Sequence, residues 1–384
     1  MATAKIGLVE LPYVRARGVK KPFILIQGGM GMRVSCPELS GKVSRRGAIG
    51  TLSSAGLSDF YIEPDGRKAS ARDAARYEVE AACFETDQEN PFVAINIMVE
   101  LKREYRESVI GAIQGNVAAI ISGAGLPLAL PGIVWDVDAL DHVALIPIVS
   151  SARAAKLICE KWWRNYGYLP DAIIIEGDKA GGHLGFKIED IGNEENSLER
   201  IFREVRQCVD DFCRDKGGIH ILIVVAGGIF FKEDIAYWID QVGADGVQMG
   251  SRFAATKESG ASSDFKKAII EADKEDIIVC GKSPCGLPFR VIKSSPGYQE
   301  ALNNPRKIKC MFGYVLQKDK QTGDFHRCPA KDTCDFFCIC GGLIAGVGKK
   351  SSYGAIYSIG SRGYLIDKII TVDELMDELG VERN

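Results

Sequence analysis

Short runs of β-branched and aliphatic residues alternate along the chain with stretches in which apolar residues recur every three to four positions. Eight such runs, each of five to eight residues, lie between Phe23 and Gly250. This alternation is typical of βα units around a parallel sheet. The predicted strands are 23–27, 48–53, 92–99, 118–122, 144–150, 172–176, 221–226 and 246–250.

Several of these runs are apolar at nearly every position, as expected for strands that are buried on both faces. The intervening periodicity predicts helices over 151–166, 197–217, 232–243 and 263–273. We therefore predict an α/β fold of the TIM (β/α)₈ barrel type. The rival architecture, an open doubly wound sheet, would normally carry a G-x-G-x-x-G fingerprint after its first strand, which QGGMGM at 27–32 does not match.

The 384-residue chain exceeds the roughly 250 residues of a simple barrel. We assign the barrel to residues 1–275 and a helical, cysteine-containing extension that packs on it to residues 276–384. The stretch 55–91 is too long for a simple loop and contains ARDAARYEVEAACF, so we expect an inserted helix there, placed as a lid over the barrel mouth.

Charge and composition exclude some classes of partner. The chain carries 48 Lys and Arg against 51 Asp and Glu, so its net charge of -3 provides no field for binding a polyanion. The N-terminal residues lack the apolar core of a signal peptide, and no run reaches the ~20 apolar residues that span a bilayer. We expect a cytoplasmic protein that acts on a small molecule, with neither nucleic acid nor membrane as a partner; a homodimer is one option for its oligomeric state.

Glycine-rich segments follow five of the predicted strands, at 27–31, 122–125, 176–186, 226–229 and 249–253. In a barrel, the loops that follow the strands build the active site, and the last two commonly bind phosphate. Backbone N–H groups at Gly227, Gly228 and Gly250, with the hydroxyl of Ser251, are suited to an anionic phosphate. Ordinary turn chemistry would explain any one of these residues alone.

Other polar and flexible residues accompany these loops. Asn96 and Gln248 are polar positions within apolar strands, and each amide can both donate a hydrogen bond to a bound ligand and accept one from it. A satisfied core asparagine is the alternative. Met30 has an equally simple alternative as a packing residue.

Six motifs, QGGMG, NIMV, SGAGLP, EGDKAGGHLGF, VAGGI and MGSRF, together resemble the nitronate monooxygenase (2-nitropropane dioxygenase) family and its sister family, the flavin-dependent enoyl-ACP reductases. The resemblance covers roughly residues 22–300. It implies tightly held FMN, with the phosphate at the four residues named above and NAD(P)H as a candidate electron donor. The isoalloxazine ring would then contact Gly29, Met30, Asn96, Ser122 and the backbone of Ala180, Gly181 and Gly182.

His183 is the candidate catalytic residue. It follows a Gly-Gly pair in a loop at the expected catalytic face, and an unperturbed imidazole with a pKa near ~6.5 can exchange a proton at neutral pH. The resemblance makes this histidine catalytic or substrate-orienting. Glu176 and Lys179 stand in the same loop, where they form either part of the site or a solvated pair. Lys179 departs from the acidic residue that many relatives carry before AGGH.

Five of the twelve cysteines cluster near the C-terminus, and their spacing matches neither common zinc knuckles nor ferredoxin clusters. Reduced, partly buried thiols are the favoured interpretation, so we assign no metal ligand. A metal or an iron–sulfur cluster stays open as the alternative. The clustered residues are Cys310, Cys328, Cys334, Cys338 and Cys340.

Three functions fit this sequence. The first is an FMN-dependent oxidoreductase that oxidises alkyl nitronates with O₂. The second is NAD(P)H-dependent reduction of an activated alkene such as an enoyl thioester, which the same pocket could support because the flavin carries the chemistry. The third, a noncatalytic flavin redox sensor that reads out through the cysteines, leaves His183 without a role.

Overall fold

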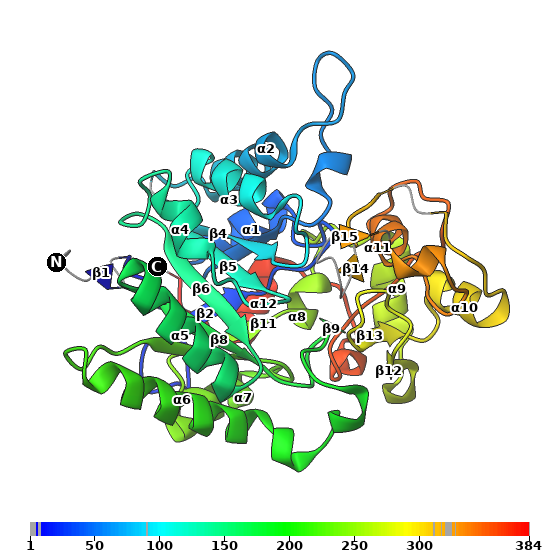
Figure 1. The fold of residues 1–384 in the computed structure, drawn as a ribbon. Coiled ribbons are helices and arrows are strands. Elements are labelled where there is room, and N and C mark those ends of the chain that lie inside the picture. Colours follow the sequence, from blue (N-terminus) through cyan, green and yellow to red (C-terminus); the bar gives the residue numbers. More distant parts are fainter. Residues whose placement is uncertain are drawn as a thin grey trace.

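The computed structural model describes residues 5–6, 9–89, 91–309, 312–315, 317–318, 325–326 and 328–383. Its centre is a sheet of eight parallel strands in the order β2-β11-β10-β8-β6-β5-β4-β3 (Figure 1). The first and last strands of this order also meet, because Ile26 and Ile49 form a parallel bridge and the Gln27 N–H donates to the Ile49 carbonyl over 2.9 Å. The sheet is thus a closed barrel, which confirms the predicted TIM fold.

All eight predicted barrel strands are present, with ends that differ from the prediction by at most two residues. They are β2 (Ile24–Gln27), β3 (Gly50–Ser53), β4 (Val93–Met98), β5 (Ala119–Gly123), β6 (Ala144–Val149), β8 (Ala172–Glu176), β10 (Leu222–Ala226) and β11 (Gly246–Met249).

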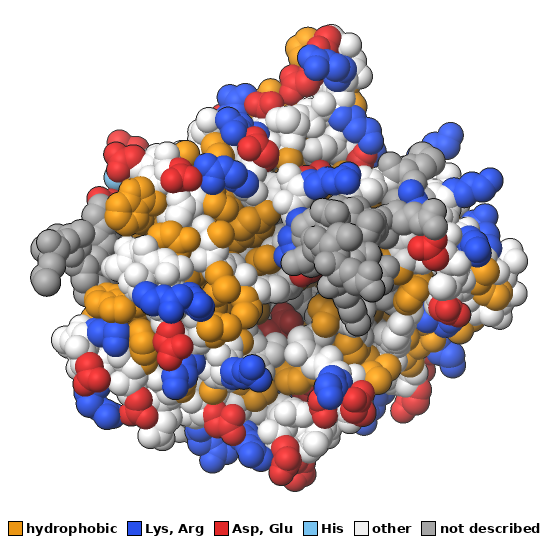
Figure 2. Space-filling model, viewed as in Figure 1, with side chains coloured by type: hydrophobic (Ala, Val, Ile, Leu, Met, Phe, Trp, Pro, Cys, Tyr) orange, Lys and Arg blue, Asp and Glu red, His pale blue; other side chains and the backbone are white. Residues whose placement is uncertain are grey.

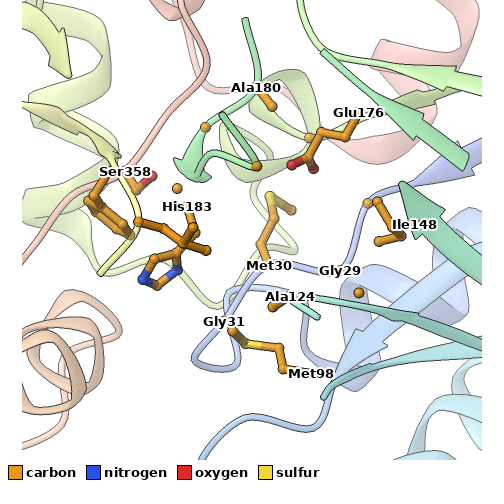
Figure 3. Close-up of a pocket in the computed structure, with 18 of the residues that line it drawn as sticks. Gly29, Met30, Gly31, Met98, Ala124, Ile148, Glu176, Ala180, His183 and Ser358 are labelled. Atoms are coloured by element: carbon orange, nitrogen blue, oxygen red, sulfur yellow. The ribbon is translucent and has the colours of Figure 1, made fainter. Parts of the chain in front are cut away.

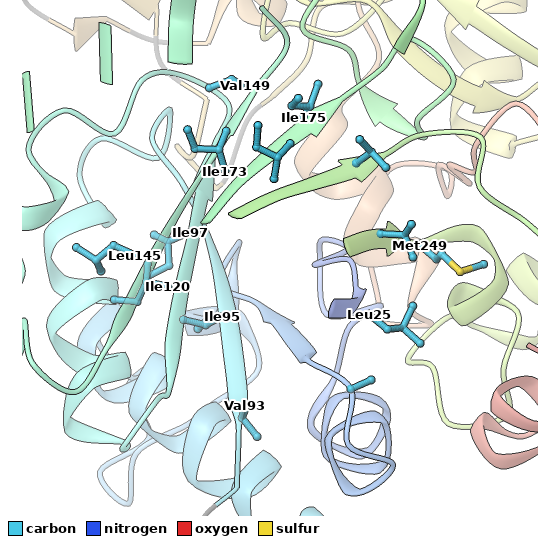
Figure 4. Close-up of a cluster of buried hydrophobic side chains, with 14 of the residues drawn as sticks. Leu25, Val93, Ile95, Ile97, Ile120, Leu145, Val149, Ile173, Ile175 and Met249 are labelled. Atoms are coloured by element: carbon cyan, nitrogen blue, oxygen red, sulfur yellow. The ribbon is translucent and has the colours of Figure 1, made fainter. Parts of the chain in front are cut away.

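The strands are buried on both faces, as their continuous apolar runs predict. One set of side chains, including Ile24, Ile146 and Ile174, fills the inside of the barrel. The alternate set, including Leu25, Ile95 and Ile173, packs outward beneath the helices (Figure 4). Because side chains alternate along each strand, the residues at the carboxyl ends that continue the inner set point into the barrel mouth.

Helices surround the barrel and follow its strands. They are α1 (Pro37–Arg45), α2 (Ala71–Thr86), α3 (Tyr105–Gln114), α4 (Leu130–Trp135), α5 (Ala152–Tyr166), α6 (Leu198–Arg214), α7 (Lys232–Ala236) with the π-helical turn η4 (Tyr237–Val242), α8 (Ser251–Ala254) and α9 (Ser263–Glu271). The four helices predicted by residue range are confirmed, including the stop at Gly243, which has a φ of 92°. Within the described residues, no helix is long and apolar enough to span a membrane.

The helix expected between residues 55 and 91 is present as α2, but its predicted position as a lid is corrected. α2 packs along its length against α1 and α3, as a regular member of the outer ring (Figure 1). The apolar residues Ala75, Val79 and Ala82 are fully buried in this ring. The apolar spacing in this segment therefore reflects packing of α2 against its neighbouring helices.

The C-terminal part of the chain mixes strands with helices. β12 (Ile277–Cys280) and β13 (Phe289–Ile292) form a hairpin that β9 (Gly182–His183) joins from the sixth barrel loop. The helices α10 (Pro296–Asn303) and α11 (Ile339–Gly346) follow this hairpin, whereas α12 (Val372–Glu378) returns to α1. The predicted boundary at 275/276 falls within the short helix η5 (Lys274–Asp276).

Several short elements complete the described structure. The strands are β1 (Lys5–Ile6), β7 (Tyr168–Leu169), β14 (Gln317–Lys318) and β15 (Phe325–His326), and the 3₁₀ turns are η1 (Leu57–Asp59), η2 (Ile188–Asp190), η3 (Glu194–Asn196), η6 (Pro329–Lys331) and η7 (Gly363–Leu365).

Candidate functional site

A cavity of about 970 Å³ lies where the carboxyl ends of the barrel strands meet the C-terminal segment. The space-filling view shows this face of the molecule hollowed near its centre, with apolar side chains around the hollow (Figure 2). The cavity lies at the end of the barrel where the fold places active sites.

The structure brings nearly all of the predicted site residues to this cavity. Those that line it are Gly29, Met30, Asn96, Glu176, Lys179, Ala180, Gly181, Gly182, His183, Gly227, Gly228, Gln248, Gly250 and Ser251. The exception is Ser122, which is buried behind the wall. Its hydroxyl donates to the Ile97 carbonyl over 2.8 Å and lies 2.9 Å from the Tyr105 hydroxyl, so we no longer assign it a flavin contact.

One end of the cavity is lined by the loops that follow β10 and β11. Gly227 and Gly228 have φ angles of 104° and 81°, a region that side chains with a Cβ rarely adopt. Among the described residues, their N–H groups donate to no backbone carbonyl. Both glycines line the cavity next to Gly250 and Ser251, so two adjacent donors without a backbone acceptor lie in its wall.

A C-terminal loop completes this end of the cavity and was not found by sequence reasoning. The N–H of Gly360 donates to Ser251 Oγ over 2.9 Å, and a Cβ on Gly181 would lie only 2.7 Å from the backbone of Ile359. Arg362 donates to the Gly228 carbonyl over 2.9 Å and forms an ion pair with Asp234 at 2.7 Å. A glycine- and serine-rich segment at 358–363 indicates a turn, but nothing local shows that it meets a loop more than a hundred residues earlier.

Lys179 belongs to the same end of the cavity. Its aliphatic stem covers Gly228, since a Cβ there would lie 2.9 Å from Lys179 Cδ. Lys179 is exposed overall and forms no ion pair with Glu176, so the solvated pair considered for these two residues is not present. Its ammonium group is therefore available to an anion bound at the glycine loops.

The floor of the cavity carries polar side chains from neighbouring strands. Glu176, Ala226 and Gln248 stand in register on β8, β10 and β11, and Ala226 belongs to the inner set of the barrel. Gln248 Oε1 is buried and accepts no hydrogen bond within the described structure. A buried acceptor without a donor is costly, so this floor is built for a ligand that supplies one.

Glu176 extends from the end of β8 into the cavity (Figure 3). Burial raises the pKa of its carboxyl to about 7. Across Met30, on the opposite side of the same space, lies the imidazole of His183 (Figure 3).

His183 is positioned by the pairing of β9 with β13, opposite Phe289. Its Nε2 lies 3.0 Å from Ser283 Oγ, and its ring meets the Phe289 ring edge-on at a centroid distance of 4.9 Å. Burial lowers the pKa of the imidazole to about 4, because a charged ring would lose its solvation here. This corrects the expectation of titration near neutrality: at neutral pH the ring is uncharged and serves as a hydrogen-bonding group.

Arg290 is a second positioning residue that sequence reasoning missed. It is buried, and its guanidinium donates to the Asp178 carbonyl over 2.7 Å and also to the Ala180 carbonyl. It thereby fixes the loop between β8 and β9 that presents Glu176 at one end and His183 at the other.

The wall on the C-terminal side is predominantly apolar. The residues that form it come from β13, α11, the segment between them and the loops that flank them: Cys285, Leu287, Phe289, Tyr314, Val315, Phe336, Ile339, Cys340, Leu343 and Ile356. Phe289 of this wall contacts the His183 ring, so the wall borders the part of the cavity that His183 lines.

The clustered cysteines divide between the core and the surface. Cys328, Cys338 and Cys340 are buried and Cys334 is exposed, whereas Cys310 lies outside the described residues. In the described part of the chain, no three His, Cys, Asp or Glu side chains come close enough to hold a metal ion.

Comparison with known proteins identifies the family. The sequence profile of the nitronate monooxygenase family matches residues 16–382. A probable nitronate monooxygenase of Staphylococcus saprophyticus is 26% identical over 74% of this chain and 80% of its own length. A putative nitronate monooxygenase of Saccharomyces cerevisiae is 33% identical, over only 39% of this chain and 37% of its own length.

Other similar proteins span nearly the whole chain. A Rhodococcus jostii (3aS,4S,5R,7aS)-5-hydroxy-7a-methyl-1-oxo-octahydro-1H-indene-4-carboxyl-CoA dehydrogenase is 23% identical over 98% of this chain and 95% of its own length. Among solved structures, FabK from Thermotoga maritima has a TM-score of 0.65 at 22% identity and covers 95% of both chains. Nitroalkane oxidase from Streptomyces ansochromogenes has a TM-score of 0.64 at 18% identity, covering 93% of this chain and 94% of its own. The barrel, its glycine-lined cavity and the match over nearly the full length agree: the chain belongs to the nitronate monooxygenase family of flavin-dependent oxidoreductases.

Proposed function

We propose that the cavity binds FMN and that the protein oxidises alkyl nitronates with O₂. The observation that carries this proposal is the convergence, in one cavity, of an anion-binding end at Gly227 and Gly228 and a hydrogen-bonding end at His183. A flavin mononucleotide has the same two-ended character, with a phosphate at one end and a redox-active ring at the other.

The residues present fit this cofactor. Gly227, Gly228, Gly250 and Ser251 would hold the phosphate, with the ammonium of Lys179 beside them. The unpartnered acceptor of Gln248 and the amide of Asn96 would meet the polar edge of the ring. FAD would need further room for a second nucleotide at the phosphate end, where the loop at 358–362 already closes the cavity.

A bound flavin supplies two-electron transfer and, when reduced, reactivity with O₂. The protein's part is to position the substrate and to exclude water. His183 is neutral at neutral pH and carries one ring N–H, which can donate a hydrogen bond to the accepting oxygen of a nitronate. Its hydrogen bond with Ser283 and its contact with Phe289 fix the ring orientation.

A second candidate function is the NAD(P)H-dependent reduction of an activated alkene such as an enoyl thioester. It is favoured by the extent of the apolar wall, which exceeds what a short alkyl nitronate could contact. The Rhodococcus relative that spans nearly the whole chain acts, by its name, on a polycyclic carboxyl-CoA compound.

Anaerobic flavin bleaching separates the two candidates. Purified protein would be mixed without oxygen with a nitronate, NADH or NADPH in parallel. We expect bleaching by the nitronate followed by reoxidation when O₂ is admitted. Rapid bleaching by a nicotinamide alone, with reoxidation by an enoyl thioester, would instead establish the second candidate. Protein that releases FAD or no flavin on denaturation would contradict the proposed cofactor.

A further inference from the structure

We propose that Glu176 binds FMN as a neutral carboxylic acid that donates a hydrogen bond, so that cofactor binding takes up one proton. This inference rests on the proposed function, because it concerns the same cavity. It adds a chemical role for a residue that neither the phosphate end nor His183 requires.

The geometry places the Glu176 carboxyl where a ligand must cover it. It stands at the carboxyl end of β8, and the small Ala226 is its direct neighbour on β10, followed by Gln248 on β11. A planar ligand lying over Ala226 would therefore lie between the two longer polar side chains. In Figure 3 the carboxyl points across the cavity toward Met30 rather than into the wall.

None of the cations in the described part of the chain forms an ion pair with this carboxyl. Burial alone raises its pKa to about 7, with no contribution from a neighbouring charge. Three cations line or adjoin this part of the cavity without pairing with Glu176: the Lys179 stem lies along Gly228, Arg290 donates to backbone carbonyls and Arg362 forms an ion pair with Asp234.

The remaining titratable groups around the cavity do not change this balance. His183 is uncharged at neutral pH, and burial raises the pKa values of Cys285 and Tyr314, which keeps both neutral. Glu100 lines the cavity and forms an ion pair with Lys102, with Oε1 and Nζ 3.3 Å apart. Asp178 Oδ2 accepts a hydrogen bond from the Gly192 N–H.

A ligand that fills the cavity removes the last water from this carboxyl and so favours its neutral form further. The neutral group has an O–H donor, and a flavin ring carries several acceptors. Gln248 Oε1 is an acceptor without a donor in the described structure. The flavin ring carries one N–H, which could donate to it. The two side chains would thus recognise complementary groups on the same ring.

The consequence is a specific dependence of FMN affinity on pH. If only the protonated carboxyl binds, the dissociation constant is flat well below the pKa and approaches a tenfold rise per pH unit above it, which amounts to about 50-fold from pH 7 to 9. The FMN phosphate has its second pKa near ~6, so it does not titrate in this window.

The test is FMN rebinding to flavin-stripped protein, followed by flavin fluorescence at pH 6, 7, 8 and 9. We expect the wild-type dissociation constant to rise with pH and that of Glu176→Gln to stay flat, because an amide donates at every pH. Equal profiles for the two proteins, or wild-type affinity that improves between pH 7 and 9, where the FMN phosphate no longer titrates, would overturn the inference. Wild-type protein that binds no FMN even at pH 6 would overturn the proposed function, and this inference with it.

A second measurement does not depend on how the variant folds. FMN is added to weakly buffered wild-type apoprotein at pH 8, and proton uptake is read with an indicator dye. We expect roughly 0.9 proton per FMN bound, because a group with a pKa of about 7 is mostly ionised beforehand. FMN binding without uptake would show that Glu176 does not become protonated.

Discussion

The two halves of the cavity are built in different ways. The barrel half consists of glycines and a few polar side chains in loops that directly follow strands, such as Gly227 after β10 and Gly250 after β11. The C-terminal half consists of apolar side chains such as Phe289 and Leu343, from elements that have no fixed place in a barrel. A ligand would therefore meet mainly backbone groups in the barrel half and mainly apolar side chains in the C-terminal half.

This difference suggests a division of labour. Backbone donors hold a constant anionic group, whereas an apolar wall of irregular elements can vary with the size and shape of the substrate. We infer that the barrel half retains the cofactor and the C-terminal half selects the substrate. The following variants test that division from each side.

The largest effect is expected at the phosphate end. Gly250→Asp places a carboxylate against the bound phosphate, so we expect loss of FMN retention. Gly250→Ala is the matched control: a Cβ there meets nothing closer than Met30 Sδ at 3.7 Å, and φ is -113°, which any residue can adopt. The absorbance ratio at 450 and 280 nm of purified protein would report retention. Flavin content unchanged in the aspartate variant would remove Gly250 from the phosphate site.

His183→Asn should affect turnover and spare the cofactor. The His183 ring contacts Phe289 of the C-terminal half, and loss of one hydrogen-bonding group that stabilises developing charge typically costs ~10²–10³ in rate. We expect normal flavin content with a slow reductive half-reaction in stopped-flow traces. Because its pKa is about 4, the wild-type rate should show no inflection near pH 6.5 from this residue. Two half-reactions at wild-type rates would exclude His183 from the mechanism.

The same division explains what could be predicted from the sequence. The strands, the glycine loops and His183 were predictable because each depends on residue type within a few positions of a strand end. Gly360 and Arg362 were not, since their partners Ser251 and Gly228 lie more than a hundred residues away. The predicted flavin contact of Ser122 could not be tested from the sequence, because a hydroxyl at a strand end can equally donate to a neighbouring backbone carbonyl, here that of Ile97.

The lid prediction failed for a related reason. The apolar period of α2 specifies a helix with one buried face, but it does not specify what covers that face. The pKa of His183 was also beyond sequence reasoning, because its shift comes from burial by β13 and the segment around Ser283.

A moderate effect is expected on the apolar wall. Leu343→Gln puts a polar amide into the C-terminal half and should raise KM for substrates with a large apolar body about tenfold, since burying one such side chain is worth ~1.5–3 kcal/mol. Affinity for FMN and KM for a short nitronate should not change. Leu302→Gln, in the exposed part of α10, is the control. Equal effects on short and long substrates would argue against a substrate-selecting wall.

The smallest effect is expected at a position that belongs to neither half. Arg46 follows α1 and donates to Asp373 and Asp377 of α12, each over 2.8 Å. Arg46→Met should destabilise the protein by about 1–3 kcal/mol because two largely exposed carboxylates lose their partner and the Val381 carbonyl loses a donor. Thermal unfolding would measure this loss. A simultaneous loss of FMN would show that α12 contributes to the cavity.

The return of α12 to α1 determines when the barrel can be completed during synthesis. Val372, Leu375 and Met376 are buried in the same core as Leu39 and Val43, so the flank of α1 stays uncovered until residues near 380 have left the ribosome. All eight barrel strands have been synthesised by residue 249, well before α12. Until α12 is synthesised, the apolar residues of α1 that it covers in the folded protein remain exposed. A premature stop codon between residues 250 and 372 would therefore yield a chain that retains all eight barrel strands yet is a substrate for chaperones and proteases.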